Sequence, residues 1–363
     1  MKPVDQQHQY TGIQALRFFA ALLVVATHAS AMIAERLMHG SVKDFWRTGL
    51  AGVDIFFVIS GFVMTMSAQR LLDRPNGWTI FLERRMIRVV PMYWIATTLK
   101  LLLVLAMPAL ALHTQLTAER VLSSYLFFPS RNADGDILPI LSVGWTLSFE
   151  MLFYLVFAAA MFIRFSPVLI SLVLFSILTF CGLLFKTVYS PAVWMFLDGL
   201  TLEFVMGMLI AQLCLKKISV PAPIGLLGIV LAAALMHFFT PQDAALSMPV
   251  LAWRFVYWGL PAMLLVGSIA LLEPAIAGRM PKLLLLLGDA SYSLYLFHTM
   301  LIPAIGVIFI KLGWLNPQFL LMVCLIVNPI VSLLFYHYLE LPLTEWLKRL
   351  RGSKKIKNEA TAV

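Results

Sequence analysis

Cysteine, charged residues and glycine-rich loops are all scarce in this 363-residue chain. Its three cysteines, Cys181, Cys214 and Cys324, stand singly in apolar stretches, which argues against a disulfide framework or a zinc site. The sequence has no phosphate-binding glycine loop of Walker or Rossmann spacing and no internal repeat of about 20 to 50 residues. Charged residues make up 12% of the chain, against about 25% in soluble domains. These absences exclude an ordinary soluble enzyme, a nucleotide-binding α/β fold and a repeat protein.

Long apolar runs take the place of these features. Hydrophobic residues make up 61% of the chain and its mean hydropathy is +0.89, which indicates a polytopic membrane protein. Residues 1–10 are polar, and no short apolar run with a small-residue cleavage site follows them, so we expect no removable signal peptide. The pattern predicts an all-α bundle of about ten transmembrane helices, near 12–33, 50–68, 80–107, 145–163, 167–186, 193–214, 221–239, 254–272, 284–310 and 316–340.

The distribution of basic residues predicts the topology. The net charge is +9, and with both termini in the cytoplasm most Lys and Arg residues fall on inner segments, as membrane proteins require. Basic clusters beside spans suit anionic lipid headgroups, so we expect no nucleic-acid partner. We expect residues 1–345 to form one integral-membrane domain and residues 346–363 to form a basic, disordered cytoplasmic tail.

Arg17 and His28 lie inside the first apolar run, with ten residues between them. Ionisable residues at membrane depth are costly and mark functional sites. Eleven residues at about 100° each return to nearly the same direction, so both side chains share one helix face, roughly 16 Å apart. One position offers a permanent cation and the deeper one offers a proton acceptor.

Three arginines open the third predicted span, in the sequence FLERRMIRVV. Arg84 and Arg88 are four residues apart and Arg85 and Arg88 three apart, so they form a cationic patch on one helix face. Guanidinium groups match phosphate oxygens in a bidentate way, which favours a phosphorylated ligand that enters from the cytoplasm. Anchoring to lipid headgroups explains the same spacing equally well.

Glu150 lies within the fourth predicted span, where a carboxylate must pair, protonate or face water. Its candidate partners are Arg17, the three arginines of the third span and His28, and the sequence does not choose among them. A structural role, in which Glu150 neutralises an arginine, is the alternative. Asp54 stands nearer a span end, where contact with outer water is an equally good explanation. For His298, in LGDASYSLYLFH, hydrogen-bonded packing is favoured over catalysis because hydroxyl groups lie within helical reach.

At these residues the chain resembles acyltransferase family 3, the bacterial membrane O-acyltransferases of envelope polysaccharides. The matching segments follow one another in order along most of the chain. They are GIQALRFFAALLVVATH, GVDIFFVISGFVM, FLERRMIRVVPMYW, GWTLSFEMLFYL, GDASYSLYLFH and YLELPLTEW. The resemblance implies about ten spans, an acyl-CoA donor that approaches from the cytoplasm, and a glycan hydroxyl as acceptor on the outer side.

The resemblance also implies roles for individual residues. It makes His28 the catalytic histidine, with Arg17 as its companion, and it places Arg85, Arg88 and Arg84 in the donor site. Glu150 corresponds to the acid of a Trp-x-x-x-x-Glu element that begins at Trp145. By this correspondence we expect Glu150, together with His28, to be catalytic. Supporting candidates in the same motifs are Asp54, Trp145, Ser148, Tyr295 and His298. No metal and no permanently bound cofactor is expected, and acyl-CoA, most simply acetyl-CoA, is the co-substrate.

The expected function is therefore transfer of an acyl group from acyl-CoA to a hydroxyl of an exopolysaccharide, lipopolysaccharide or related glycan at the bacterial inner membrane. The alternative is a transporter or flippase of a lipid-linked sugar or anion, because intramembrane Arg, His and Glu also mark transport paths. The absence of a repeat between the two halves of the sequence argues against common transporter folds. The acyl group, the acceptor sugar and the oligomeric state stay open.

Overall fold

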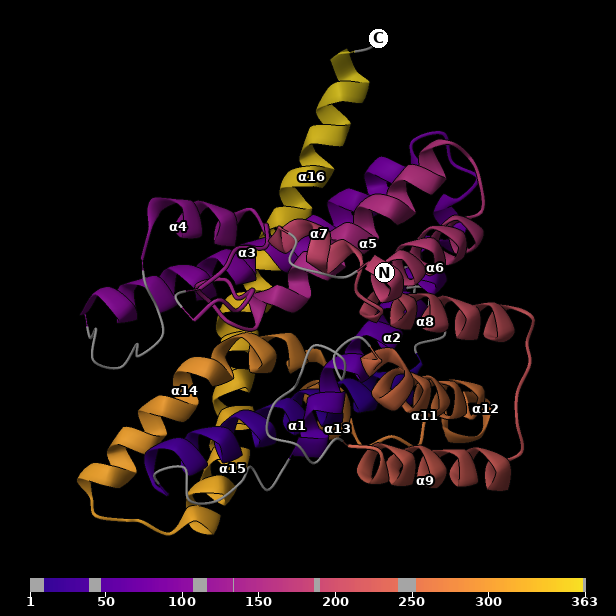
Figure 1. Ribbon diagram of the computed structural model, residues 1–363. Helices are drawn as coiled ribbons and strands as arrows, with labels where there is room; N and C mark the ends of the chain where they lie inside the picture. The colour runs from indigo at the N-terminus through magenta and orange to yellow at the C-terminus, as the bar shows by residue number, and fades with distance from the viewer. Residues whose placement is uncertain are drawn as a thin grey trace.

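The computed structural model describes residues 10–38, 47–106, 116–132, 134–185, 190–240 and 253–361. Within these ranges the chain is helical, and its one extended feature is an isolated antiparallel bridge between Arg131 and Ile137. The helices pack side by side as a bundle from which α16 projects toward the C-terminus (Figure 1). The predicted all-α membrane bundle is confirmed.

The order of elements follows the predicted spans closely. In chain order the helices are α1 (Thr11–Arg36), η1 (Arg47–Leu50), α2 (Ala51–Ala68), η2 (Gln69–Leu71), α3 (Gly77–Ala106), α4 (Ala118–Tyr125), α5 (Gly144–Phe162), α6 (Pro167–Phe185), α7 (Pro191–Phe196), α8 (Leu200–Leu215), α9 (Ala222–Phe238), η4 (Phe255–Gly259), α11 (Leu260–Leu271), α12 (Glu273–Ile276), α13 (Lys282–Asp289), α14 (Ser291–Lys311), α15 (Pro317–Phe335), η5 (Tyr336–Glu340) and α16 (Leu341–Thr361).

Eight helical stretches in the described part of the chain are long and apolar enough to cross a membrane. They correspond to eight of the ten predicted spans. The other two predictions, 221–239 and 254–272, correspond to shorter apolar helices, Ala222–Phe238 and Phe255–Leu271. A helix of 17 residues rises about 25 Å, less than the roughly 30 Å of a bilayer core. The cytoplasmic placement of the termini stays a prediction.

Two predicted spans are interrupted in the structure. The span predicted at 193–214 divides into α7 and α8 around Asp198, whose carboxylate accepts a hydrogen bond of 3.0 Å from the backbone N–H of Leu200 at the start of α8. The span predicted at 284–310 is likewise two helices, α13 and α14, which meet at Ala290. Predicting it as one continuous helix was wrong, since apolar composition does not reveal a short break.

The closest helix pairing is between α2 and α8. A Cβ atom added at Gly61 would overlap the carbonyl oxygen of Phe204, and one added at Gly207 would overlap the carbonyl oxygen of Val58. The two glycines thus let the backbones touch, as small residues do between membrane helices. Beside this crossing, the rings of Phe153 and Phe204 stack at 4.0 Å. The pairing fixes α2 at the centre of the bundle.

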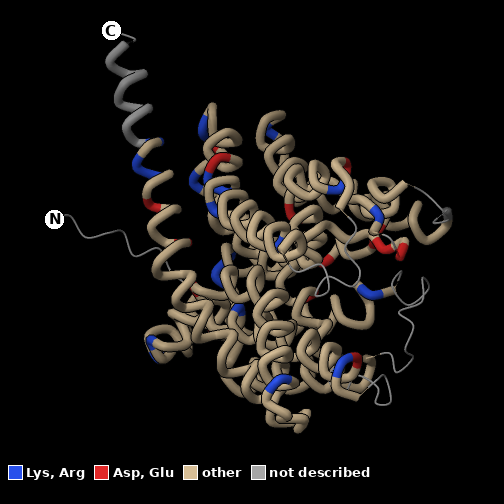
Figure 2. Tube along the Cα trace, turned by 90° about the vertical axis from the view of Figure 1, so that its left-hand side faces the viewer, with Lys and Arg blue, Asp and Glu red and all other residues tan. Residues whose placement is uncertain are grey.

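The C-terminal segment continues as helix α16 from Leu341 to Thr361. It crosses residue 345, where we expected the membrane domain to end, so the division into domain and tail stays a prediction. Arg351 forms an ion pair of 2.9 Å with Glu83 at the start of α3. Figure 2 shows how sparse charged residues are along the other helices. The ion pair ties the basic segment to the helix that carries the arginine cluster.

We expect Gly61→Ala to lower the free energy of unfolding by about 1–3 kcal/mol, because an added methyl group forces the backbones of α2 and α8 apart. Thermal unfolding of the detergent-solubilised protein measures this loss. Gly267→Ala is the matched control, since a Cβ there would meet Ile210 side-chain carbons at an ordinary 3.7 Å. Equal midpoints for both variants would contradict the close approach of α2 and α8.

Candidate functional site

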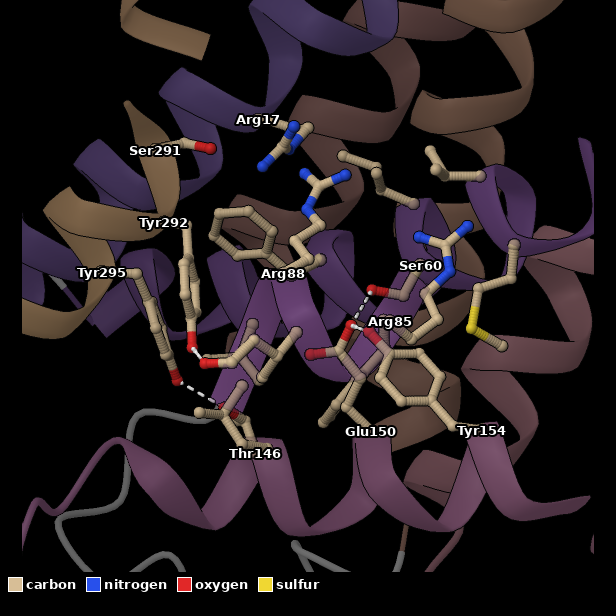
Figure 3. Close-up of a pocket in the computed structure, with 18 residues that line it drawn as sticks. Arg17, Ser60, Arg85, Arg88, Thr146, Glu150, Tyr154, Ser291, Tyr292 and Tyr295 are labelled. Carbon is tan, nitrogen blue, oxygen red and sulfur yellow. Dashed lines mark hydrogen bonds between the residues drawn. The ribbon is translucent and has the colours of Figure 1, made fainter. Parts of the chain in front are cut away.

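A cavity of about 110 Å³ lies inside the bundle between α1, α2, α3, α5 and α14. Its walls combine apolar side chains of α2 with polar groups from all five helices. The polar lining residues are Arg17, Ser60, Arg85, Arg88, Thr146, Glu150, Tyr154, Ser291, Tyr292 and Tyr295 (Figure 3). The structure therefore brings together three of the four predicted donor-binding arginines and Glu150.

Arg17 and Arg88 face the cavity without a direct partner. Neither guanidinium makes a hydrogen bond or ion pair with another residue in the described part of the chain, and they lie beside each other (Figure 3). The carboxylates of Glu340, Asp289 and Glu150 attract Arg17 from a distance. Two like charges side by side in an apolar surrounding repel strongly. An anion placed between them would remove this cost.

Asp289 belongs to the surroundings of the same arginines. It ends α13, outside the candidate spans, and accepts a hydrogen bond of 2.6 Å from the Gln14 side chain. Burial raises the pKa of the Asp289 carboxyl, and the Arg17 and Arg88 guanidinium groups oppose this effect. Asp289 is thus one of the carboxylates that surround the two cavity arginines without a direct ion pair to either.

Arg85 and Arg84 differ although they are adjacent in sequence. Arg85 lines the cavity, donates a hydrogen bond to the Ser67 hydroxyl, and lies 5.6 Å above the Phe81 ring. Arg84 is exposed and does not line the cavity. The predicted patch of three arginines is therefore split, because neighbouring residues point about 100° apart on a helix.

Glu150 finds partners that the sequence analysis did not consider. Its Oε1 accepts a hydrogen bond of 2.5 Å from the Tyr154 hydroxyl, and the Ser60 hydroxyl lies 3.5 Å from the same oxygen. None of the five candidate partners forms an ion pair with it in the part of the chain that the structure describes. The spacing of four residues between Glu150 and Tyr154 was a usable signal, since such pairs share a helix face.

Two tyrosines of α14 form the opposite wall. The Tyr292 hydroxyl donates to the Val89 carbonyl at 2.8 Å. The Tyr295 hydroxyl lies 2.8 Å from the Thr146 hydroxyl (Figure 3). It also lies 3.2 Å from the Val143 carbonyl oxygen. These bonds hold α14 against α3 and α5. They place both aromatic rings at fixed positions in the cavity wall.

His28 lies outside the lining of this cavity and beside His298. The His298 Nε2 atom is 3.4 Å from the His28 Nδ1 atom, and the ring centroids are 4.9 Å apart. His298 is fully buried, and its ring centroid lies 6.0 Å from that of Tyr295, which does line the cavity. The two predicted histidines thus form a pair next to the cavity. The sequence analysis had not connected them.

Asp54 has a structural partner, which explains its burial. Its carboxylate forms a two-pronged ion pair with Arg254, with bonds of 2.9 and 2.8 Å, and both side chains are almost completely buried. Of the two explanations left open for Asp54, contact with outer water does not hold, since its exposure is 0%. The Arg254 guanidinium lies 4.9 Å above Trp258 and 5.9 Å from Trp145.

The remaining supporting candidates pack near the cavity. Ser148 is buried on α5 and does not line the cavity. Trp145 packs edge-on against Phe57 and Phe149. Among the described residues, no group of three or more His, Cys, Asp or Glu side chains could hold a metal ion. The arrangement is suited to binding an anion next to a histidine pair.

We expect Arg254→Met to lower the free energy of unfolding by about 3–5 kcal/mol, because it leaves the Asp54 carboxylate buried without its cation. Thermal unfolding in detergent tests this, and the double variant Asp54→Leu with Arg254→Met should recover most of the loss. Arg349→Met is the control, since Arg349 and Glu345 form an exposed pair at 3.7 Å. A loss as small as the control's would show that the buried pair is dispensable.

Comparison with known proteins identifies the family of this chain. The Acyltransferase domain family matches residues 10–337. The chain is 35% identical over 314 residues to the exopolysaccharide production protein ExoZ of Rhizobium meliloti, covering 85% of this chain and 94% of that protein. It is 26% identical over 148 residues to the acyltransferase MdmB of Streptomyces mycarofaciens, covering 40% and 37% of the two chains. No solved structure matches it. This multi-pass membrane protein, with its arginine-lined cavity beside a histidine pair, belongs to acyltransferase family 3.

Proposed function

We propose that the protein transfers a short acyl group, most simply acetyl, from cytoplasmic acyl-CoA to a hydroxyl of an exopolysaccharide or related envelope glycan. The name of ExoZ supports a glycan acceptor. The site for this reaction is the bacterial cytoplasmic membrane, across which CoA and a surface glycan approach from opposite sides. The observation that carries the proposal is the cavity with three arginines, two of which have no direct protein partner.

The cavity supports a donor that carries phosphate. Guanidinium groups bind phosphate oxygens through paired, charge-assisted hydrogen bonds. Arg17, Arg85 and Arg88 come from two helices and converge on one space. A volume of about 110 Å³ admits part of such a donor, with phosphate oxygens against the arginines, while the adenosine of CoA has to stay outside. Arg84, exposed on the same helix, suits the approach to the cavity.

The reaction needs a base for the attacking hydroxyl and positive charge near the developing oxyanion. We assign His28 as the base. The hydroxyl oxygen attacks the thioester carbonyl carbon, His28 takes the hydroxyl proton, the C–S bond breaks, and the proton passes to the leaving thiolate. Glu150, held by Tyr154 and Ser60 in the cavity wall, offsets part of the arginine charge while no donor is bound.

Transport of a lipid-linked sugar or anion is the alternative, because an arginine-lined cavity in a membrane also suits a transport path. The two functions differ in their effect on the surface glycan. Mass spectrometry of glycans from intact and deletion strains separates them. Loss of one fixed acyl mass supports transfer, and loss of the whole glycan without a change in acylation supports transport.

We expect His28→Ala to lower the rate of acyl transfer by about 10²–10⁴-fold, the usual effect of removing a general base. The assay is transfer of radiolabelled acetyl from acetyl-CoA to glycan in membranes that contain equal amounts of each protein. His237→Ala, at an exposed position of α9, is the control. Full activity of His28→Ala would remove the assignment of His28 as the base.

We expect Arg88→Ala to raise the dissociation constant of CoA by roughly 10–100-fold, since a hydrogen bond to a charged group is worth about 1.5–3 kcal/mol. Calorimetric titration of the purified protein with CoA measures it. Arg279→Ala is the control, because Arg279 is exposed and bonds only to a nearby carbonyl. Unchanged CoA affinity in Arg88→Ala would assign the cavity arginines to lipid anchoring instead.

A further inference from the structure

The histidine pair joins two helices that are far apart in sequence. His28 belongs to α1 and His298 to α14, and their rings meet edge to face at 62°. His298 has no exposed surface, and its Nε2 atom is directed at Nδ1 of His28 over 3.4 Å. Burying a polar ring nitrogen costs free energy unless it has a hydrogen-bond partner. The contact between the two ring nitrogens therefore indicates a hydrogen bond rather than apolar packing alone.

The backbone contacts of the two rings determine their tautomers. The Nδ1 atom of His28 lies 2.9 Å from the Val24 carbonyl oxygen, and Nδ1 of His298 lies 3.1 Å from the Leu294 carbonyl oxygen. A carbonyl oxygen can only accept, so in each neutral ring Nδ1 carries the hydrogen. The lone pair is then on Nε2 in both rings, and Nε2 of His298 accepts from the His28 Nδ1–H group.

We propose that His298 is a positioning residue for His28: it accepts the Nδ1–H of His28 and thereby keeps the basic lone pair on His28 Nε2. The catalytic consequence rests on the proposed function, in which His28 is the base. When His28 Nε2 takes the proton of the attacking hydroxyl, the ring becomes an imidazolium. Its Nδ1–H then donates to the Val24 carbonyl and to His298 with greater strength, because the donor is charged.

The same logic operates in serine hydrolases, where a carboxylate orients the histidine and stabilises its protonated form. Here a neutral ring takes the place of the carboxylate. This suits the apolar centre of a bundle, since a buried carboxylate would need a further cation. The proton of the hydroxyl rests on His28 while the new C–O bond forms, and it leaves with the thiolate when the C–S bond breaks. His298 therefore does not itself gain or lose a proton.

The tautomer is measured directly by nitrogen NMR of detergent-solubilised protein labelled with ¹⁵N-histidine, with His28→Asn used to assign the signals. We expect both His28 and His298 to carry hydrogen on Nδ1, whereas free neutral imidazoles in water favour Nε2–H. His28 with its hydrogen on Nε2 would overturn the proposal. This readout does not depend on catalysis.

Kinetics of two variants test the acceptor role. His298→Gln can present its amide oxygen near the position of Nε2, and His298→Leu cannot. We expect His298→Leu to lower kcat on the order of 10–100-fold, the worth of one hydrogen bond to a group that becomes charged, with an unchanged KM for the acyl donor. His298→Gln should recover a large part of kcat, and His237→Gln, on the exposed face of α9, should match the intact protein.

These measurements separate two kinds of failure. Equal losses of kcat in His298→Gln and His298→Leu, with both proteins folded by size-exclusion chromatography, would overturn the acceptor role. Full kcat in a folded His298→Leu would overturn it as well. Full activity in His28→Ala, together with Nδ1–H tautomers in the intact protein, would leave the pairing established and refute the base assignment on which its catalytic use depends.

Discussion

An ionised group inside a bilayer has to be compensated, and the pattern of compensation in this bundle identifies its site. Asp54 and Arg254 neutralise each other at 2.8 Å. The Glu273 carboxylate accepts from the backbone amides of Thr11 and Gly12 at the start of α1. In contrast, the guanidinium groups of Arg17 and Arg88 lie side by side without a direct partner in the described chain. The buried ion pair of the described chain thus joins two helices, whereas the two cavity arginines have no direct counter-ion there.

The position of that cavity depends on how closely the helices approach. Gly61 and Gly207 bring the backbones of α2 and α8 into contact, which fixes α2 so that a neighbouring face contributes Ser60 to the cavity. Gly144 allows a similar close approach on α5, because a Cβ there would meet the Tyr93 ring at 2.7 Å. Close packing on one face of α2 and α5 therefore fixes the polar residues that these helices present to the cavity on another face.

The sequence predicted the class, most spans and the three arginines that line the cavity, because apolar length and charge at membrane depth are local properties. It could not predict partners, which depend on helix rotation and on contacts between distant segments. The pairs of Asp54 with Arg254 and of His28 with His298 join residues 200 and 270 positions apart. The helix break near Ala290 was also missed, since one small residue hardly changes the hydropathy of a span. Arg84 was grouped with Arg85 by spacing. The rotation of about 100° between neighbouring helix residues nevertheless leaves the Arg84 side chain exposed and directs the Arg85 side chain into the cavity.

The arrangement also bears on how two substrates from opposite sides of a membrane could meet. Tyr295 lines the arginine cavity, and its ring lies 6.0 Å from that of His298, which contacts His28. The arginine-lined cavity and the histidine pair are therefore neighbours that share one wall rather than parts of one open space. Under the proposed function, the thioester of a donor whose phosphate groups contact Arg17 and Arg88 would reach His28 only past this wall, where Thr146 and Val143 hold Tyr295.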